Sequence, residues 1–212
     1  MNLSVVILAG GRSNRMGRDK AWLLLDGQTL LARQIELIRK LEPTEVFVSG
    51  RTDTDYKAFG CSVLTDRFPE AGPLAGIEAA LHMATATLVL VLAVDMPHMT
   101  DIVLQRLLVK CSTGVGVVPR LNHHIEPLAA VYPKAAKPIA VELLNQRLRA
   151  VRSFAERCKQ SRMVTFLDMN ANDHGFFANW NSPADMITLR SPSQNVPPAN
   201  GRPAAVGCLC HD

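Results

Sequence analysis

Short apolar runs alternate along the chain with segments in which apolar residues recur every three or four positions. The apolar runs have the length of strands, and they predict strands at residues 3–8, 45–48, 61–64, 88–94, 114–118, 128–132 and 163–167. Residues 3–8 and 88–94 are apolar at nearly every position. Such runs are typical of strands that are buried on both faces, as in a parallel sheet with two covering layers.

The periodic segments predict helices at residues 29–41, 73–84, 101–109, 134–145 and 151–160. In the first of them, Leu31, Ile35 and Ile38 fall on one stripe, and Pro43 follows its end. The second begins with Pro73, which is favourable in a first helical turn. Because strands and helices alternate through most of the chain, we predict an α/β fold with a mainly parallel central sheet between two helical layers.

The composition narrows the setting. The 212 residues carry a net charge of +4, too small an excess to indicate a nucleic-acid partner. Five scattered cysteines, an N-terminus without signal-peptide character and no apolar run of membrane-spanning length favour the cytoplasm. From residue 190 the sequence becomes rich in Pro, Ser, Asn and Gly, so we predict one domain over residues 1–189 and a disordered tail over residues 190–212.

The segment LAGGRSNRMGRDK, residues 8–20, follows the first predicted strand. Glycines allow backbone N–H groups to approach phosphate oxygens, and Arg15 and Lys20 add positive charge. The spacing matches neither the dinucleotide fingerprint nor the P-loop. The alternative is an ordinary strand-to-loop turn with solvated charges, but the complete run of glycines and basic residues favours a polyphosphate site.

Two carboxylates are further candidates. Asp95 follows the predicted central strand, at the edge where open α/β sheets bind ligands, and its carboxylate oxygens are ligands that suit Mg²⁺. The alternative for Asp95 is a cap on the next helix. Glu126 follows His123 and His124 in a predicted loop before Pro127. A metal site or a general base is one interpretation of this group, but no third ligand is clear in the sequence, and a plain loop is the alternative.

Four collinear segments carry a resemblance to a known family. The sequence letters are LAGGRSNRMGRDK, then Asp66 with GPLAG at residues 72–76, then DMP at residues 95–97, and NWNSP at residues 179–183. Together they closely resemble the sugar-nucleotide-type nucleotidyltransferases, and they are most similar to the molybdenum cofactor guanylyltransferases (the MobA family). The resemblance covers about residues 3–189 and implies a three-layer, Rossmann-like nucleotidyltransferase fold.

The resemblance also implies site residues. It places GTP on a set of backbone and side-chain groups at Leu8, Ala9, Gly10, Gly11, Lys20, Ser49, Asp66 and Asp95. It implies catalytic roles for Arg15, Lys20 and Asp95, with Asp95 as the Mg²⁺ ligand. Glu126, Asn179 and Asn181 would face the second substrate. Ser49 is a departure, because the family has an asparagine at this point.

The implied reaction transfers GMP from GTP to molybdopterin that carries molybdenum, with release of pyrophosphate. The pathway implies a molybdenum insertase, a GTP-binding accessory protein and molybdoenzyme chaperones as partners. A related enzyme that uses CTP, or another phosphorylated acceptor, is an alternative, and so is a non-catalytic nucleotide-binding module. A Rossmann dehydrogenase is disfavoured, because its glycine fingerprint is absent.

Overall fold

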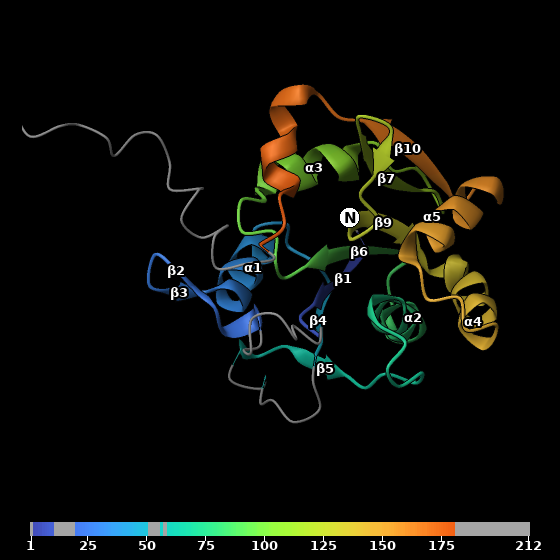
Figure 1. Ribbon diagram of the computed structural model, residues 1–212, viewed down its shortest axis with the longest axis horizontal. Helices are drawn as coiled ribbons and strands as arrows, with labels where there is room; N and C mark the ends of the chain where they lie inside the picture. The colour runs from blue at the N-terminus through green and yellow to red at the C-terminus, as the bar shows by residue number, and fades with distance from the viewer. Residues whose placement is uncertain (1, 11–19, 51–55, 57–58, 181–212) are drawn as a thin grey trace, which may run out of the picture.

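A mixed sheet forms the centre of the protein (Figure 1). The computed structural model describes residues 2–10, 20–50, 56 and 59–180. Within these residues, seven strands follow one another across the sheet in the order β10-β7-β9-β6-β1-β4-β5, and β8 pairs with β7 at one side. Their bounds are β1 Leu3–Leu8, β4 Glu45–Ser49, β5 Ser62–Leu64, β6 Leu88–Ala93, β7 Gly116–Leu121, β8 His124–Ile125, β9 Ala129–Pro133 and β10 Val164–Asp168.

The sheet is mainly parallel, as the sequence predicts. The β1 strand pairs in parallel with β4 on one side and with β6 on the other, and β4 pairs in parallel with β5. The β9 strand runs antiparallel to both β6 and β7, while β10 returns parallel to β7. Every residue of β1 and of β6 is buried, which agrees with their continuous apolar sequences.

Helices cover both faces of the sheet. Their bounds are α1 Leu30–Arg39, α2 Pro73–Met83, α3 Asp101–Val109, α4 Lys137–Asn145 and α5 Val151–Gln160. Alternate residues of β1 point to opposite sides: Val5 and Ile7 pack in the cluster that contains α1 and α3, and Val6 packs in the cluster that contains α2, α4 and α5. Figure 1 shows these two groups of helices on opposite sides of the sheet.

Short elements complete the fold. A two-stranded hairpin consists of β2 Leu24–Leu25 and β3 Gln28–Thr29, and it lies outside the main sheet. Three 3-10 helices are η1 Lys20–Trp22, η3 Lys134–Ala136 and η4 Ala171–Phe177, all within the described residues. The sequence pattern predicted none of β2, β3, β8, η1 and η4. The three strands and η1 have only two or three residues, too few to show a hydrophobic period, and a 3-10 helix such as η4 does not follow the period of 3.6.

Several predicted bounds need correction by one to three residues. The predicted helix at residues 134–145 divides into η3 and α4, with Pro at the start of α4. The predicted strand at residues 114–118 begins at Gly116 and continues to Leu121, because the antiparallel partner β8 extends the pairing. No helix in the described part of the chain is long and apolar enough to cross a membrane. The division into residues 1–189 and 190–212 stays a prediction, because residues 181–212 lie outside the described residues.

Candidate active site

The carboxyl ends of β1, β4 and β6 meet at one edge of the sheet. Backbone N–H groups of Ala9 and Gly10 both donate to the Ser49 carbonyl, at 2.7 and 3.0 Å. On the other side, the Val94 N–H donates to the Leu8 carbonyl at 3.1 Å. The start of the glycine loop is therefore tied to both neighbouring strands, so its backbone position is fixed by the sheet.

Helix α2 approaches this edge unusually closely. A Cβ atom at Gly76 would lie 2.3 Å from Ser49 Oγ and 2.9 Å from Leu8 Cδ2. A Cβ atom does not approach non-bonded oxygen or carbon atoms so closely, so only glycine permits the observed packing at this position. The turn before α2 also needs glycine, because Gly72 has a φ of +72°. The GPLAG segment thus serves close packing of α2 against the ends of β1 and β4.

Asp66 lies just beyond β5, at the same edge. Ser49 Oγ donates a long hydrogen bond of 3.5 Å to Asp66 Oδ1. Burial raises the pKa of Asp66; the Ser49 hydrogen bond opposes this, and the nearby Glu78 carboxylate adds to it. The structure therefore brings Ser49 and Asp66 together, as the resemblance implies, although the serine stands where the family has an asparagine.

Lys20 and Asp95 meet across the site. Lys20 is the first residue of η1, and Asp95 comes two residues after β6. Lys20 Nζ lies 2.6 Å from Asp95 Oδ2, and the two side chains are 20% and 19% exposed. Ala21 next to the lysine is completely buried, which anchors the lysine backbone in the core. Both charged groups thus reach the sheet edge from a fixed backbone and remain open to solvent on one side.

The helix-capping alternative for Asp95 is wrong. The N-cap of α3 is Thr100, whose hydroxyl accepts from the Val103 N–H at 3.4 Å. The backbone of Asp95 instead has another partner, since its carbonyl accepts from the Trp180 N–H at 2.9 Å. The Asp95 carboxylate itself bonds to Lys20 Nζ, at 2.6 Å.

The candidate second-substrate residues lie on other elements. Glu126 follows β8 and is half-buried, with its N–H donating to the Pro119 carbonyl at 2.8 Å. Burial raises the pKa of Glu126, and the Arg152 guanidinium partly opposes this. Asn179 is exposed directly before the buried Trp180. Arg15, Gly11 and Asn181 lie outside the described residues, so their predicted roles stay predictions.

Among the described residues, no group of three or more His, Cys, Asp or Glu side chains is arranged to hold a metal ion. Mg²⁺ in nucleotide enzymes commonly takes one or two carboxylates, with substrate phosphates and water completing its octahedron. The single, partly exposed Asp95 carboxylate fits such a site, in which the nucleotide supplies most ligands. It does not fit an all-protein cage.

Two comparisons with known proteins decide the family. The MobA-like NTP transferase domain matches residues 5–162. A protein of Opitutus terrae named "Probable molybdenum cofactor guanylyltransferase" is 37% identical over 186 residues, which cover 86% of this chain and 92% of that protein. The chain belongs to the MobA-like NTP transferase family. A relative of the same name from Pelotomaculum thermopropionicum is 34% identical over 201 residues, 90% of this chain and 93% of that one.

The fold of this MobA-like NTP transferase agrees with a solved structure. The crystal structure of molybdopterin-guanine dinucleotide biosynthesis protein A from Archaeoglobus fulgidus superposes with a TM-score of 0.70 at 24% identity. The match covers 87% of this chain and 95% of that chain. The predicted nucleotidyltransferase fold is therefore confirmed, as are the family resemblance and the prediction of an enzyme of the nucleotidyltransferase class.

Sequence reasoning missed two features of this MobA-like site. Glu78, in α2, is completely buried, and its Oε1 accepts from Arg67 Nη1 at 3.1 Å. A single acidic residue in a helical pattern gives no sign of such burial. The backbone link from Trp180 to Asp95 was also missed, because nothing in the sequence relates two residues so far apart in the chain.

Proposed function

We propose that the protein transfers the guanylyl group of GTP to molybdopterin that carries molybdenum, forming the guanine dinucleotide of the cofactor and pyrophosphate. The observation that carries this proposal is the Lys20–Asp95 pair, with 2.6 Å between Nζ and Oδ2, at the sheet edge where the glycine loop begins. The names of the relatives from Opitutus terrae and Pelotomaculum thermopropionicum support the choice of substrates.

In this proposal the strand ends hold the nucleotide. The backbone at Leu8, Ala9 and Gly10 would contact the phosphates, and the roles predicted for Gly11 and Arg15 fall in the part of the chain outside the described residues. Ser49 and Asp66, which lie within hydrogen-bonding distance of each other, form the neighbouring wall. Helix α2 supports this wall closely, because a Cβ atom at Gly76 would collide with Ser49 and Leu8.

Lys20 and Asp95 act on the phosphates. The Lys20 ammonium would neutralise charge on the triphosphate, which reduces repulsion between two anionic substrates. Asp95 would hold Mg²⁺, which when bound supplies positive charge to the nucleotide phosphates. In the structure the two side chains form an ion pair, which gives each of them a defined orientation before substrate binds.

The reaction itself needs little proton transfer. A terminal phosphate oxygen of the pterin attacks the α-phosphorus of GTP; the new P–O bond forms as the bond to the bridging oxygen breaks, and pyrophosphate leaves with that electron pair. A phosphate monoester has a second pKa of about 6 and is already anionic near neutral pH. The protein therefore supplies alignment and charge neutralisation.

The acceptor would lie on the side of Glu126, Asn179 and Asn181. Glu126 is half-buried and Asn179 is exposed, and the two side chains differ in the hydrogen bonds that they can make with the acceptor. The asparagine amide can donate to a phosphate or a pterin carbonyl, whereas a carboxylate with a raised pKa can accept from pterin N–H groups. The protein partners of the pathway, namely the insertase, the accessory protein and the chaperones, stay predictions.

Pyrophosphate release tests the proposal. GTP, CTP and ATP are supplied in turn with Mg²⁺, with and without molybdenum-loaded molybdopterin. We expect release only with GTP and the pterin together. Release with CTP would move the protein to a cytidylyl activity, and silence with every nucleotide despite GTP binding would favour another acceptor or a non-catalytic module.

Two variants test the assigned residues. We expect Asp95→Asn and Lys20→Ala to lose about a hundredfold or more in turnover while keeping the fold, because they remove charge at the reacting phosphates. Matched controls are Asp168→Asn and Lys110→Ala, which remove exposed groups on β10 and after α3. Near-normal turnover in either site variant would contradict its role.

A further inference from the structure

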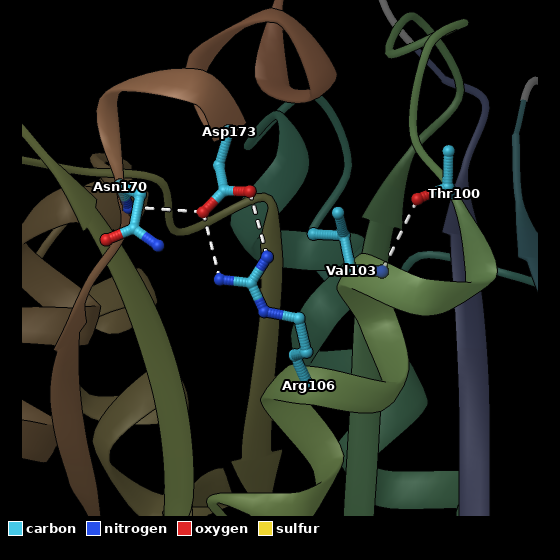
Figure 2. A network of polar contacts seen from close by, with 5 residues as sticks. All are labelled: Thr100, Val103, Arg106, Asn170 and Asp173. Carbon is cyan, nitrogen blue, oxygen red and sulfur yellow. Dashed lines mark hydrogen bonds and ion pairs between the residues drawn. The ribbon is translucent and has the colours of Figure 1, made fainter.

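A two-pronged ion pair joins α3 to η4 (Figure 2). Arg106 Nη1 lies 2.8 Å from Asp173 Oδ1, and Arg106 Nη2 lies 2.9 Å from Asp173 Oδ2. Two parallel hydrogen bonds between planar groups fix orientation as well as distance. The Asp173 side chain is only 8% exposed, and its Oδ2 also accepts from the Asn170 N–H at 3.1 Å. The pair is therefore a defined joint rather than a loose surface contact.

Each element of this joint leads directly into the active site. Helix α3 is preceded by residues 95–100, which begin with Asp95. The η4 turn is followed by residues 178–180, which include Asn179. Where these two segments meet, the Trp180 N–H donates to the Asp95 carbonyl at 2.9 Å. The segment from Asp95 through α3 is thus linked to the segment from η4 to Trp180 at two points. One link is the Arg106–Asp173 ion pair, and the other is the Trp180–Asp95 backbone hydrogen bond.

The surroundings of Asp95 are held from the opposite side as well. Gln34 Nε2 donates to the Met96 carbonyl at 2.7 Å, and Arg33 Nε donates to the Pro97 carbonyl at 3.0 Å. Both donors come from α1, which packs in the same cluster as Trp180. The Trp180 side chain is 2% exposed, so it cannot shift without disturbing this packing. The Asp95 segment consequently has one anchor on α1 and another on the chain that leaves η4.

We propose that the Arg106–Asp173 pair positions the acceptor side of the site, at Asn179, relative to the phosphate side, at Asp95. This inference rests on the proposed function, in which these two residues serve different substrates. In-line displacement requires the attacking oxygen and the α-phosphorus to be aligned, and a displacement of about 1 Å costs about a hundredfold in rate. A joint remote from both substrates can therefore control the reaction without contacting either.

Removing one partner should loosen the acceptor side while leaving the nucleotide side intact. The wall made by β1, β4, β5 and α2 does not include Arg106 or Asp173. Asp173→Asn places an amide, with two N–H donors, opposite a guanidinium that has no acceptor. Arg106→Lys keeps the charge but loses the two-pronged geometry. Both variants should therefore affect acceptor use and spare GTP binding.

The test compares three variants in the full-length chain. We expect Asp173→Asn and Arg106→Lys to raise the KM for the pterin or lower kcat by about tenfold or more, with the Kd for GTP within about twofold of wild type. The matched control is Glu142→Gln, which breaks the ion pair from Arg157 Nη1, 2.7 Å away, between α4 and α5 on the other face. The control should change neither constant.

Hydrogen exchange of the Trp180 amide gives a second readout that needs no acceptor. We expect faster exchange of this amide in both joint variants and unchanged exchange in Glu142→Gln. Wild-type-like exchange and kinetics in both joint variants would overturn the proposal, and so would a parallel loss of GTP affinity, which would indicate general destabilisation. If the wild-type protein shows no transfer with any nucleotide, the proposed function fails, while the exchange data still decide whether the joint positions Trp180.

Discussion

Replacing Gly76 with alanine tests the close approach of α2 to the active-site edge. The added Cβ would lie 2.3 Å from Ser49 Oγ and 2.9 Å from both Ser49 Cβ and Leu8 Cδ2. All three distances are shorter than normal contacts, so the helix or the ends of β1 and β4 must shift. Overpacking of this kind typically costs about 1–3 kcal/mol of unfolding free energy. The same shift would move Ser49 relative to Asp66 and weaken GTP binding.

Thermal unfolding measures the cost. For a chain of this size, 1 kcal/mol corresponds to about 2–4 °C in Tm, so Gly76→Ala should lower Tm by about 2–12 °C. The control is Gly175→Ala, in η4, where a Cβ would meet no described atom within 4 Å and the backbone φ is not positive. The control should stay within about 0.5 kcal/mol of wild type.

A second background separates the clash from helix effects. Ser49→Gly removes two of the three short contacts, and the one that remains is the end of the flexible Leu8 side chain. In this background Gly76→Ala should cost less than about 1 kcal/mol of unfolding free energy. The difference from its cost in the wild-type background is the coupling energy between the two neighbouring positions. The reasoning fails if Gly76→Ala is neutral in the wild-type background, or if its cost is the same in both backgrounds.

Two further predictions concern titrating groups. Burial raises the pKa of Asp66, and the Glu78 carboxylate raises it further. The protonated Asp66 carboxyl group therefore stabilises the folded state below its unfolded pKa of about 3.9, and this stabilisation is lost as pH rises through the folded pKa. Asp66→Asn should accordingly match wild type in urea unfolding near pH 3, be more stable at pH 7, and bind GTP more weakly; equal stability at pH 7 would contradict the assignment. Burial raises the pKa of Cys111 to about 11 and that of Cys158 to about 12, so mass spectrometry after alkylation at pH 8 should find both thiols slow to react in the native protein and fast in denaturant. Rapid native labelling of Cys158 would refute the burial argument.

The layers of the fold follow from local sequence. Residues 3–8 and 88–94 are apolar on both faces of an extended chain, and such strands are stable only inside a covered sheet. Pro73 and the apolar residues that follow it indicate the start and buried face of α2, which the structure confirms. The candidate nucleotide residues could be named because LAGGRSNRMGRDK, GPLAG and DMP resemble segments of a known nucleotidyltransferase family.

Direction and pairing needed the tertiary structure. The predicted strand near residues 128–132 has the same apolar character as its parallel neighbours, yet β9 lies antiparallel between β6 and β7. An apolar run is equally suited to either direction, because side chains alternate in the same way in both. The hairpin β2–β3 escaped prediction for another reason, since two-residue strands hold no period.

By itself, the sequence determined the α/β class and the buried strands, because the periods of 2 and 3.6 are properties of the local backbone. Its motifs indicated the candidate site residues through their resemblance to a known family. The tertiary structure decided which of those residues touch. Lys20 and Asp95 are 75 positions apart and Arg106 and Asp173 are 67 apart, and their contacts arise from the packing of whole elements. No local pattern encodes such a contact, since each one depends on the summed geometry of every strand and helix between its two residues.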